Sequence, residues 1–67
     1  MEKHDKRFGT VAIKKGFITS QQLVGALKIQ IQDELEGNKY RLTGEILRDE
    51  GYMTDSQVDE VLSLMGF

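Results

Sequence analysis

The chain has 67 residues, of which 39% are hydrophobic and 30% charged, a composition that suits one small folded domain and excludes a disordered segment. The absence of Cys and the single His exclude disulfide scaffolds, thiol chemistry and cysteine-based zinc sites, and no apolar run is long enough for membrane insertion. The net charge is −2, but residues 1–30 hold six Lys and Arg against two acids, and residues 31–67 hold three against nine. We therefore expect a soluble, cytoplasmic domain whose first half would bind an anion, if either half does.

The spacing of apolar residues predicts an all-α fold, a small four-helix bundle made of two helix-turn-helix repeats. We expect helices at about residues 5–15, 20–36, 40–50 and 55–65. In the longest of them Leu23, Leu27, Ile31 and Leu35 recur every four residues, which is typical of an amphipathic helix. No sustained alternation of apolar and polar residues indicates a strand.

An internal repeat organises the chain. A shift of 35 residues aligns residues 9–30 with residues 44–65. The motif Gly-Phe-Ile-Thr-x-x-Gln-Leu begins at Gly16, and its counterpart Gly-Tyr-Met-Thr-x-x-Gln-Val begins at Gly51. We expect a single domain over residues 1–67, with repeats at about 5–37 and 40–66.

Both repeats carry the same signals for the beginning and end of helices. Thr19 and Thr54 each precede a Gln by three positions, which is the spacing of a capping box at a helix start. Glycines stand where a preceding helix must end with a residue of positive φ. These glycines are Gly16, Gly37, Gly51 and Gly66.

Catalytic and metal-binding chemistry finds little support in the sequence. The single His, His4, lies close to the N-terminus, and we interpret it as a surface residue. Adjacent acids such as Asp59 and Glu60 cannot face each other on a helix, and no glycine-rich phosphate loop is present. We expect no enzyme, no cofactor and no metal site.

Two features are candidates for ligand binding. Arg7, Lys14 and Lys15 could hold a phosphate or stack on a base, although a solvated basic face is the alternative. Gln30 could bond a base edge, or it could simply lie at the edge of the apolar face. The turn that begins at Gly16 also suits a helix-turn-helix DNA reader, but the next predicted helix has one basic residue, Lys28, so DNA binding is not favoured.

The segment from Arg7 to Gln30 resembles the N-terminal domain of type II secretion and type IV pilus assembly ATPases, the family of general secretion pathway protein E. The family pattern runs Arg-Leu-Gly, apolar positions, Gly, an apolar pair, Leu, Leu and a closing Gln, and the resemblance extends through both repeats. It implies an all-α module that docks a cytoplasmic membrane-platform protein or regulates an adjoining domain. The chain lacks the ATPase motif itself, so no ATP hydrolysis is expected.

In one branch of that family two tandem copies bind the bacterial messenger cyclic di-GMP. The resemblance places ligand contacts on Arg7, Gly9 and Gln30, and apolar packing against the ligand on Phe8, Leu23 and Leu27. The second copy departs from the pattern with Leu42 at the Arg position, Arg48 at an apolar position and Met65 at the closing Gln. One chain therefore offers one half-site, and a homodimer would bring two copies of the first motif together.

We expect first a non-catalytic protein–protein interaction or regulatory module, whose partner is a secretion or pilus platform component or a signalling protein. The alternative is a regulator that binds cyclic di-GMP. Its expected ligand-binding residues are Arg7, Phe8, Gly9, Lys14, Lys15, Leu23, Leu27 and Gln30. Because so short a chain leaves apolar side chains partly covered, a partner protein is expected to contact Phe17, Tyr52, Met53 and Phe67.

Overall fold

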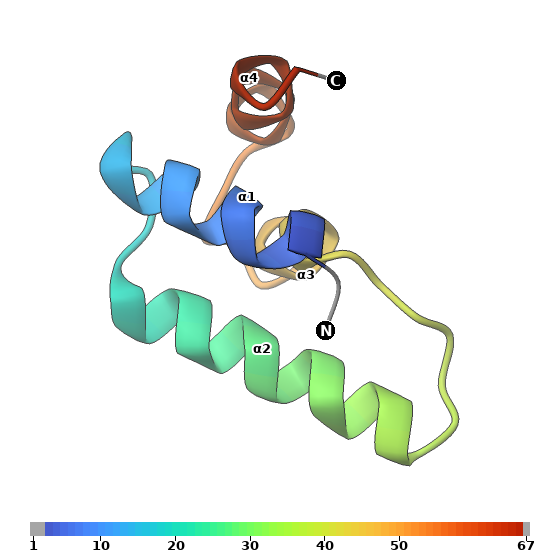
Figure 1. Ribbon diagram of the computed structural model, residues 1–67. Coiled ribbons are helices and arrows are strands. Elements are labelled where there is room, and N and C mark those ends of the chain that lie inside the picture. Colours follow the sequence, from blue (N-terminus) through green and yellow to red (C-terminus); the bar gives the residue numbers. More distant parts are fainter. Residues whose placement is uncertain (1–2, 67) are drawn as a thin grey trace.

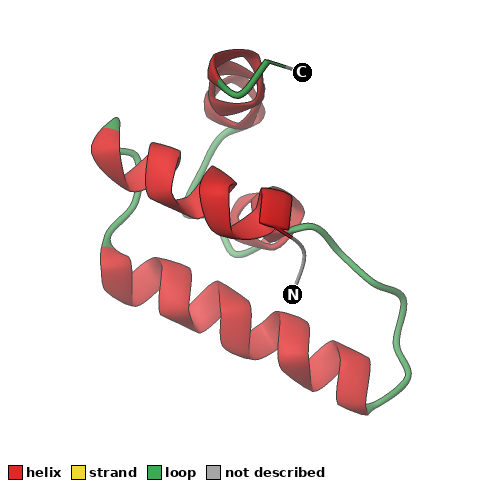
Figure 2. Cartoon of the chain, viewed as in Figure 1, coloured by secondary structure: helices red, strands yellow, loops and turns green. Residues whose placement is uncertain are grey.

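The computed structural model describes the backbone of residues 3–66 and the side chains of residues 7–66. The described chain forms four helices: α1 (Lys3–Lys14), α2 (Ser20–Leu35), α3 (Thr43–Asp49) and α4 (Asp55–Leu64). It has no strand between residues 3 and 66, as Figure 2 shows. The prediction of an all-α chain with four helices is thus confirmed for this part of the sequence.

The two helix pairs, α1 with α2 and α3 with α4, pack against each other. α3 packs against α1, α2 and α4, and α1 packs in addition against α4. In Figure 1, α1 and α3 lie in the middle, with α2 on one side of them and α4 on the other. The first helix of each pair therefore packs against the second helix of the other pair, and no other described helix lies on the side of α2 that faces away from α1 and α3.

The core sits where α1 and α3 meet. Its buried apolar residues come from all four helices and from both tight turns: Phe8, Ala12, Ile18, Ala26, Ile46, Leu47, Met53 and Val61. Gly44 lets α3 approach α1 closely, because a Cβ atom at this position would lie 2.8 Å from Cζ of the Phe8 ring. Burial of these side chains supplies most of the stabilisation in so small a chain.

The helix-end signals predicted at the two threonines and at the four glycines are confirmed. Thr19 and Thr54 each accept a hydrogen bond at Oγ1, over 3.1 Å, from the backbone N–H of the Gln three positions later. Each of these Gln side chains accepts in return from the backbone N–H of its Thr. Gly16 and Gly51 end the preceding helices with φ of 78° and 81°, a conformation that costs little only for glycine. Positive φ is also found at Gly37 and Gly66.

The start of α3 differs from its prediction. A helix is expected from residue 40, but α3 begins at Thr43 and residues 38–42 are not helical. Leu42 has no hydroxyl group to cap the helix, so only half of a capping box forms, in which Glu45 Oε1 accepts from the Leu42 N–H over 3.1 Å. The extended segment before Leu42 is instead held against α2 by side-chain hydrogen bonds described below.

Removing either threonine cap is expected to destabilise the whole domain. Thr19→Ala or Thr54→Ala leaves an N–H group at the start of a helix without its acceptor, which lowers the free energy of unfolding by about 0.5–2 kcal/mol. Urea unfolding followed by circular dichroism measures this loss. Thr54→Ser keeps the hydroxyl group and is the matched control. Equal stability of Thr54→Ala and Thr54→Ser would contradict the capping role.

Candidate functional site

The residues that the family resemblance assigns to a ligand do not gather at one surface. Phe8 lies in the core with 4% of its surface exposed, and its ring packs on Gly44 instead of facing a ligand. Gly9 is buried against α2, because a Cβ atom at this position would collide with Cδ1 of Leu23. Leu23 and Leu27 are partly buried on α2. Phe8, Gly9 and Leu23 thus serve the packing of α1 on its neighbours.

Gln30 is buried, and its side-chain amide forms hydrogen bonds with other residues of the chain. Only 5% of its surface is exposed. Its Nε2 donates to the backbone carbonyl of Arg41 over 2.9 Å and to the hydroxyl of Tyr40 over 3.4 Å. These bonds hold the extended segment before α3 against α2. The side chain therefore satisfies a backbone carbonyl group in a partly buried hydrogen bond, which is a structural role that a contact with a base edge would disrupt.

Shortening Gln30 is expected to cost stability. Gln30→Ala removes the donor to the Arg41 carbonyl, and loss of such a partly buried hydrogen bond costs about 0.5–1.5 kcal/mol of unfolding free energy. Urea unfolding provides the measurement. Gln21→Ala is the matched control, because Gln21 is an exposed amide on the same helix. A Gln30→Ala variant as stable as the Gln21→Ala variant would show that the hydrogen bond contributes nothing.

Arg41 joins α2 to α3 through two carboxylates. Its Nη2 lies 2.7 Å from Oδ2 of Asp33 on α2, and its Nη1 lies 3.2 Å from Oδ2 of Asp49 at the end of α3. The hydrogen bonds from Arg41 lower the pKa of Asp33, more than partial desolvation raises it. The same bond to Asp33 raises the pKa of Arg41. Together with Gln30, this cluster fixes the path of the chain from α2 to α3.

Lowering the pH is expected to destabilise the fold through protonation of Asp33. Because Arg41 lowers the pKa of the Asp33 carboxyl in the folded chain, the ionised carboxylate stabilises the fold. This stabilisation is complete above the pKa that Asp33 has in the unfolded chain, about 4. It is lost as the pH falls through the lower, folded pKa. Urea midpoints recorded from neutral to acidic pH test this, with Asp59→Asn on α4 as control. An acid slope that is identical in Asp33→Asn and in the unmodified chain would contradict the assignment.

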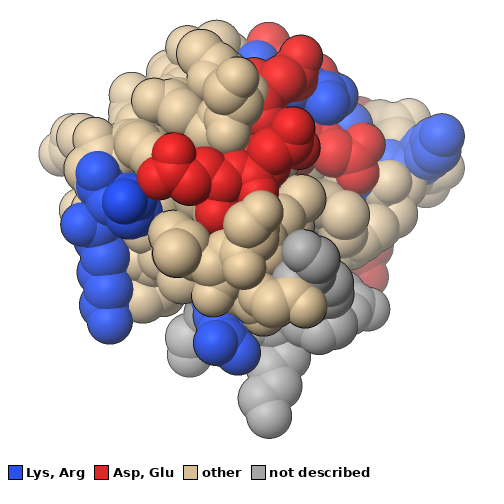
Figure 3. All heavy atoms as spheres, turned by 90° about the horizontal axis from the view of Figure 1, so that it is seen from above, with Lys and Arg blue, Asp and Glu red and all other residues tan. Residues whose placement is uncertain are grey.

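The basic residues of α1 stay at the surface and do not converge with Gln30. Arg7 and Lys14 are exposed, and Lys15, just after the helix, forms an ion pair with Glu60 of α4 over 3.1 Å. Figure 3, which looks onto the α4 side of the molecule, shows acidic side chains gathered across this face, with Lys and Arg near its margins. An anion approaching Lys15 would therefore meet a neighbouring carboxylate.

The four residues expected to contact a partner have different surroundings. The expectation is wrong for Met53, which is buried in the core. Its equivalent in the first repeat, Ile18, is buried as well, because the second apolar residue of each turn closes the angle between two helices. Phe17 is half-buried against the core, and Tyr52 is exposed. Phe67 lies outside the described residues.

A larger apolar surface lies on α2, on the side opposite its buried Ala26 and Gln30. We call this surface the outer face of α2. It consists of Val24, Leu27, Lys28, Ile31 and Leu35, which lie within an arc of about 100° around the helix axis. Val24 and Ile31 are each 50% exposed and Leu35 is 78% exposed. Large aliphatic side chains in a row on a helix surface are typical of a contact site for another chain.

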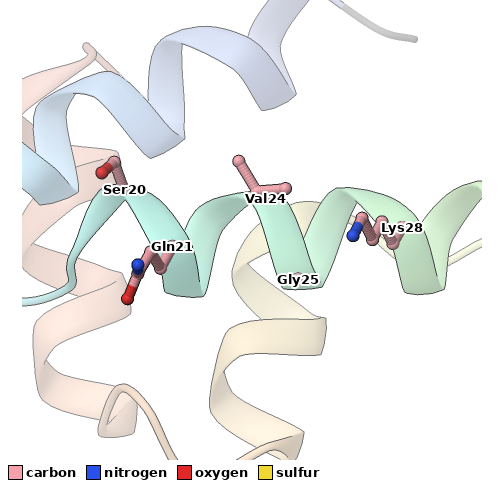
Figure 4. Close-up of a pocket in the computed structure, with 5 residues that line it drawn as sticks. All are labelled: Ser20, Gln21, Val24, Gly25 and Lys28. Atoms are coloured by element: carbon pink, nitrogen blue, oxygen red, sulfur yellow. The ribbon is translucent and has the colours of Figure 1, made fainter.

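A shallow hollow of about 340 Å³ extends this face toward the start of α2. Figure 4 shows that its lining comes from α2 alone. The lining residues are Ser20, Gln21, Val24, Gly25 and Lys28. Nothing lies within 4 Å of the place that a Cβ atom on Gly25 would take, so the hollow is open for an approaching side chain.

The sequence indicates this exposed surface only when the four-residue spacing is considered together with the rotation of the helix. Leu23, Leu27, Ile31 and Leu35 recur every four residues, but a helix turns by about 100° per residue. Each step of four therefore moves about 40° around the axis, and Leu35 points about 120° away from Leu23. Exposure rises accordingly, from the half-buried Leu23 and Leu27 to the exposed Leu35.

Among the side chains of residues 7–66, no group of three or more His, Cys, Asp or Glu is placed to hold a metal ion. Among the described helices, none combines the length and apolar character needed to cross a membrane. Comparison with known proteins adds no further site, since no protein-family model, curated protein or solved structure matches the chain.

Proposed function

We propose that this chain is a non-catalytic interaction module that binds another polypeptide through the outer face of α2. The observation that carries the proposal is the exposure of Val24, Ile31 and Leu35 on the side of α2 opposite the buried Ala26 and Gln30. When a partner covers such an exposed aliphatic row, apolar surface is removed from water, which stabilises the complex.

The chemistry of the face favours a protein partner over a nucleic acid. Lys28 is its only charged residue, whereas binding to phosphate backbones requires several Lys or Arg side chains on one surface. Val24, Ile31 and Leu35 offer no hydrogen-bonding groups to read a base. The spacing of these residues instead matches the positions i, i+7 and i+11 through which a helix contacts another helix.

The resemblance to the secretion and pilus ATPase N-terminal domains supports a partner of the corresponding type. In that family the domain docks a cytoplasmic membrane-platform protein or regulates an adjoining domain. A cytoplasmic module that contributes a helix face to such an assembly needs no catalytic residue. Its contribution is to place one chain against another.

Site-specific photo-cross-linking tests this proposal. A photoreactive phenylalanine analogue replaces Ile31 on the outer face of α2, and in a control chain it replaces Leu64 on α4, which is similarly exposed at 55%. We expect an adduct of defined mass from position 31 that is missing from position 64 and lost when Val24→Arg is added. Adducts that are identical at the two positions, or missing from both, would overturn the proposal.

A further inference from the structure

We infer that the outer face of α2 binds a second copy of this chain, with the two α2 helices antiparallel around a two-fold axis. This inference rests on the proposed function, since it names the occupant of the same face. Three observations carry it: the spacing of residues on the face, the distribution of charge along α2, and the position of the hollow beside Val24.

Four of the five residues of the outer face have a spacing that is the same in both directions. Val24, Lys28, Ile31 and Leu35 are separated by four, three and four residues. Alternating steps of four and three residues are those of helices that pack knobs into holes. When a second helix is reversed about the midpoint between Lys28 and Ile31, Val24 meets Leu35 of the second copy. The two ends of the apolar row, Val24 and Leu35, then cover each other.

Charge decides the direction of the second helix. A parallel pair would place Lys28 directly against Lys28 of the second copy, whereas the antiparallel pair places it beside Ile31, which its aliphatic stem can cover. The first half of α2, residues 20–27, is uncharged and has the positive end of the helix dipole. The second half has Lys28, Asp33 and Glu34, a net charge of −1, and the negative end. Reversal therefore brings unlike halves together.

The hollow gives Leu35 a place to pack. Leu35 is the most exposed large hydrophobic residue of the described chain, at 78%. In the antiparallel pair it lies level with Val24 of the second copy, at the side of the hollow formed with Gly25 and Lys28. The two-fold axis repeats this contact at the other end, so each copy both inserts a leucine and receives one.

One helix pair forms a small interface, so the association is expected to be weak and reversible. Sedimentation velocity from about 10 μM to about 1 mM covers the corresponding affinities. We expect the mean mass to rise with concentration toward that of a dimer. A chain that stays monomeric over the whole range would overturn the inference.

Three substitutions locate the interface. Ile31→Arg places a charge at the centre of the face and should weaken association at least about tenfold. Leu64→Arg, at the similarly exposed position on α4, should leave the association unchanged. Lys28→Leu removes the charge from the central layer and should strengthen association at least about tenfold. Equal effects of the two arginine substitutions, or weaker association of Lys28→Leu, would overturn the inference. Circular dichroism of each variant shows whether the fold is retained.

Cysteine cross-linking tests the antiparallel direction. The chain has no Cys of its own, so introduced residues report cleanly. A mixture of Val24→Cys and Leu35→Cys chains in a glutathione redox buffer should form mainly the mixed disulfide, because only an antiparallel pair brings these positions together. A preference for the disulfide between two Val24→Cys chains would indicate a parallel pair and would overturn the inference.

The two proposals fail in distinguishable ways. If the purified chain is monomeric while position 31 cross-links to a different protein, the second copy is the wrong occupant and the interaction module stands. If position 31 cross-links to a second copy and Ile31→Arg abolishes the dimer, both proposals are supported. If the chain is monomeric and position 31 gives no adduct, both are overturned.

Discussion

Replacing Phe8 by alanine is expected to remove a large share of the stability of the fold. The ring is buried and packs on the α3 backbone at Gly44. Truncation of a buried phenylalanine costs about 3–5 kcal/mol, because it removes apolar contacts and leaves a cavity. A domain of this length has a total unfolding free energy of only about 3–10 kcal/mol. Urea unfolding of Phe8→Ala, followed by circular dichroism, measures the loss.

Phe17→Ala is the matched control for this experiment. Phe17 is half-buried at the edge of the core, so the same truncation should cost clearly less than at Phe8. If Phe8 were mainly a ligand contact, its loss would leave the urea midpoint nearly unchanged. That result would contradict the core role that the structure gives to this side chain.

Leu47→Ala is expected to destabilise both repeats together by about 2–5 kcal/mol. Leu47 is fully buried on α3, the helix that packs against all three others. Its carbonyl group also accepts hydrogen bonds from the N–H groups of Tyr52 and Met53, over 2.9 and 3.3 Å. Amide hydrogen exchange should show an equal loss of protection in α1 and α4, because unfolding of a domain this small is cooperative.

Leu42→Ala provides the contrast, since Leu42 lies at the start of the same helix but is exposed. Its effect should remain within about 0.5 kcal/mol, as for most surface substitutions. Loss of protection in Leu47→Ala that is confined to α3 and α4 would show that the two repeats unfold independently, contrary to the interlocked packing.

The ends of the helices could be predicted from the sequence because their signals are local. A capping box needs only a Thr and a Gln three positions later, and both copies, at Thr19 and Thr54, form as expected. Positive φ at a helix end depends on the glycine at that position, and Gly16 and Gly51 adopt it. The repeat made each signal appear twice, which strengthened the prediction.

The candidate site could not be predicted to the same extent, because it depends on residues distant in sequence. The packing of α1 and α3 decides which side of α2 is buried, so Leu35 is exposed although it continues the apolar row. The role of Gln30 depends on the carbonyl group of Arg41, eleven positions later, in a segment that was expected to be helical. Nothing in the local pattern around Gln30 identifies that carbonyl group.

The packing of each helix pair against the other bears on the evolutionary origin of the chain. α1 packs against α4 and α3 packs against α2, so each pair completes the core of the other. Two separate copies of one ancestral pair, associated about a two-fold axis, would make the same contacts. Gene duplication followed by fusion through residues 36–42 would convert such a homodimer into this single-chain fold. A chain cut in this connection is accordingly expected to form a two-part protein, whose halves fold on meeting each other.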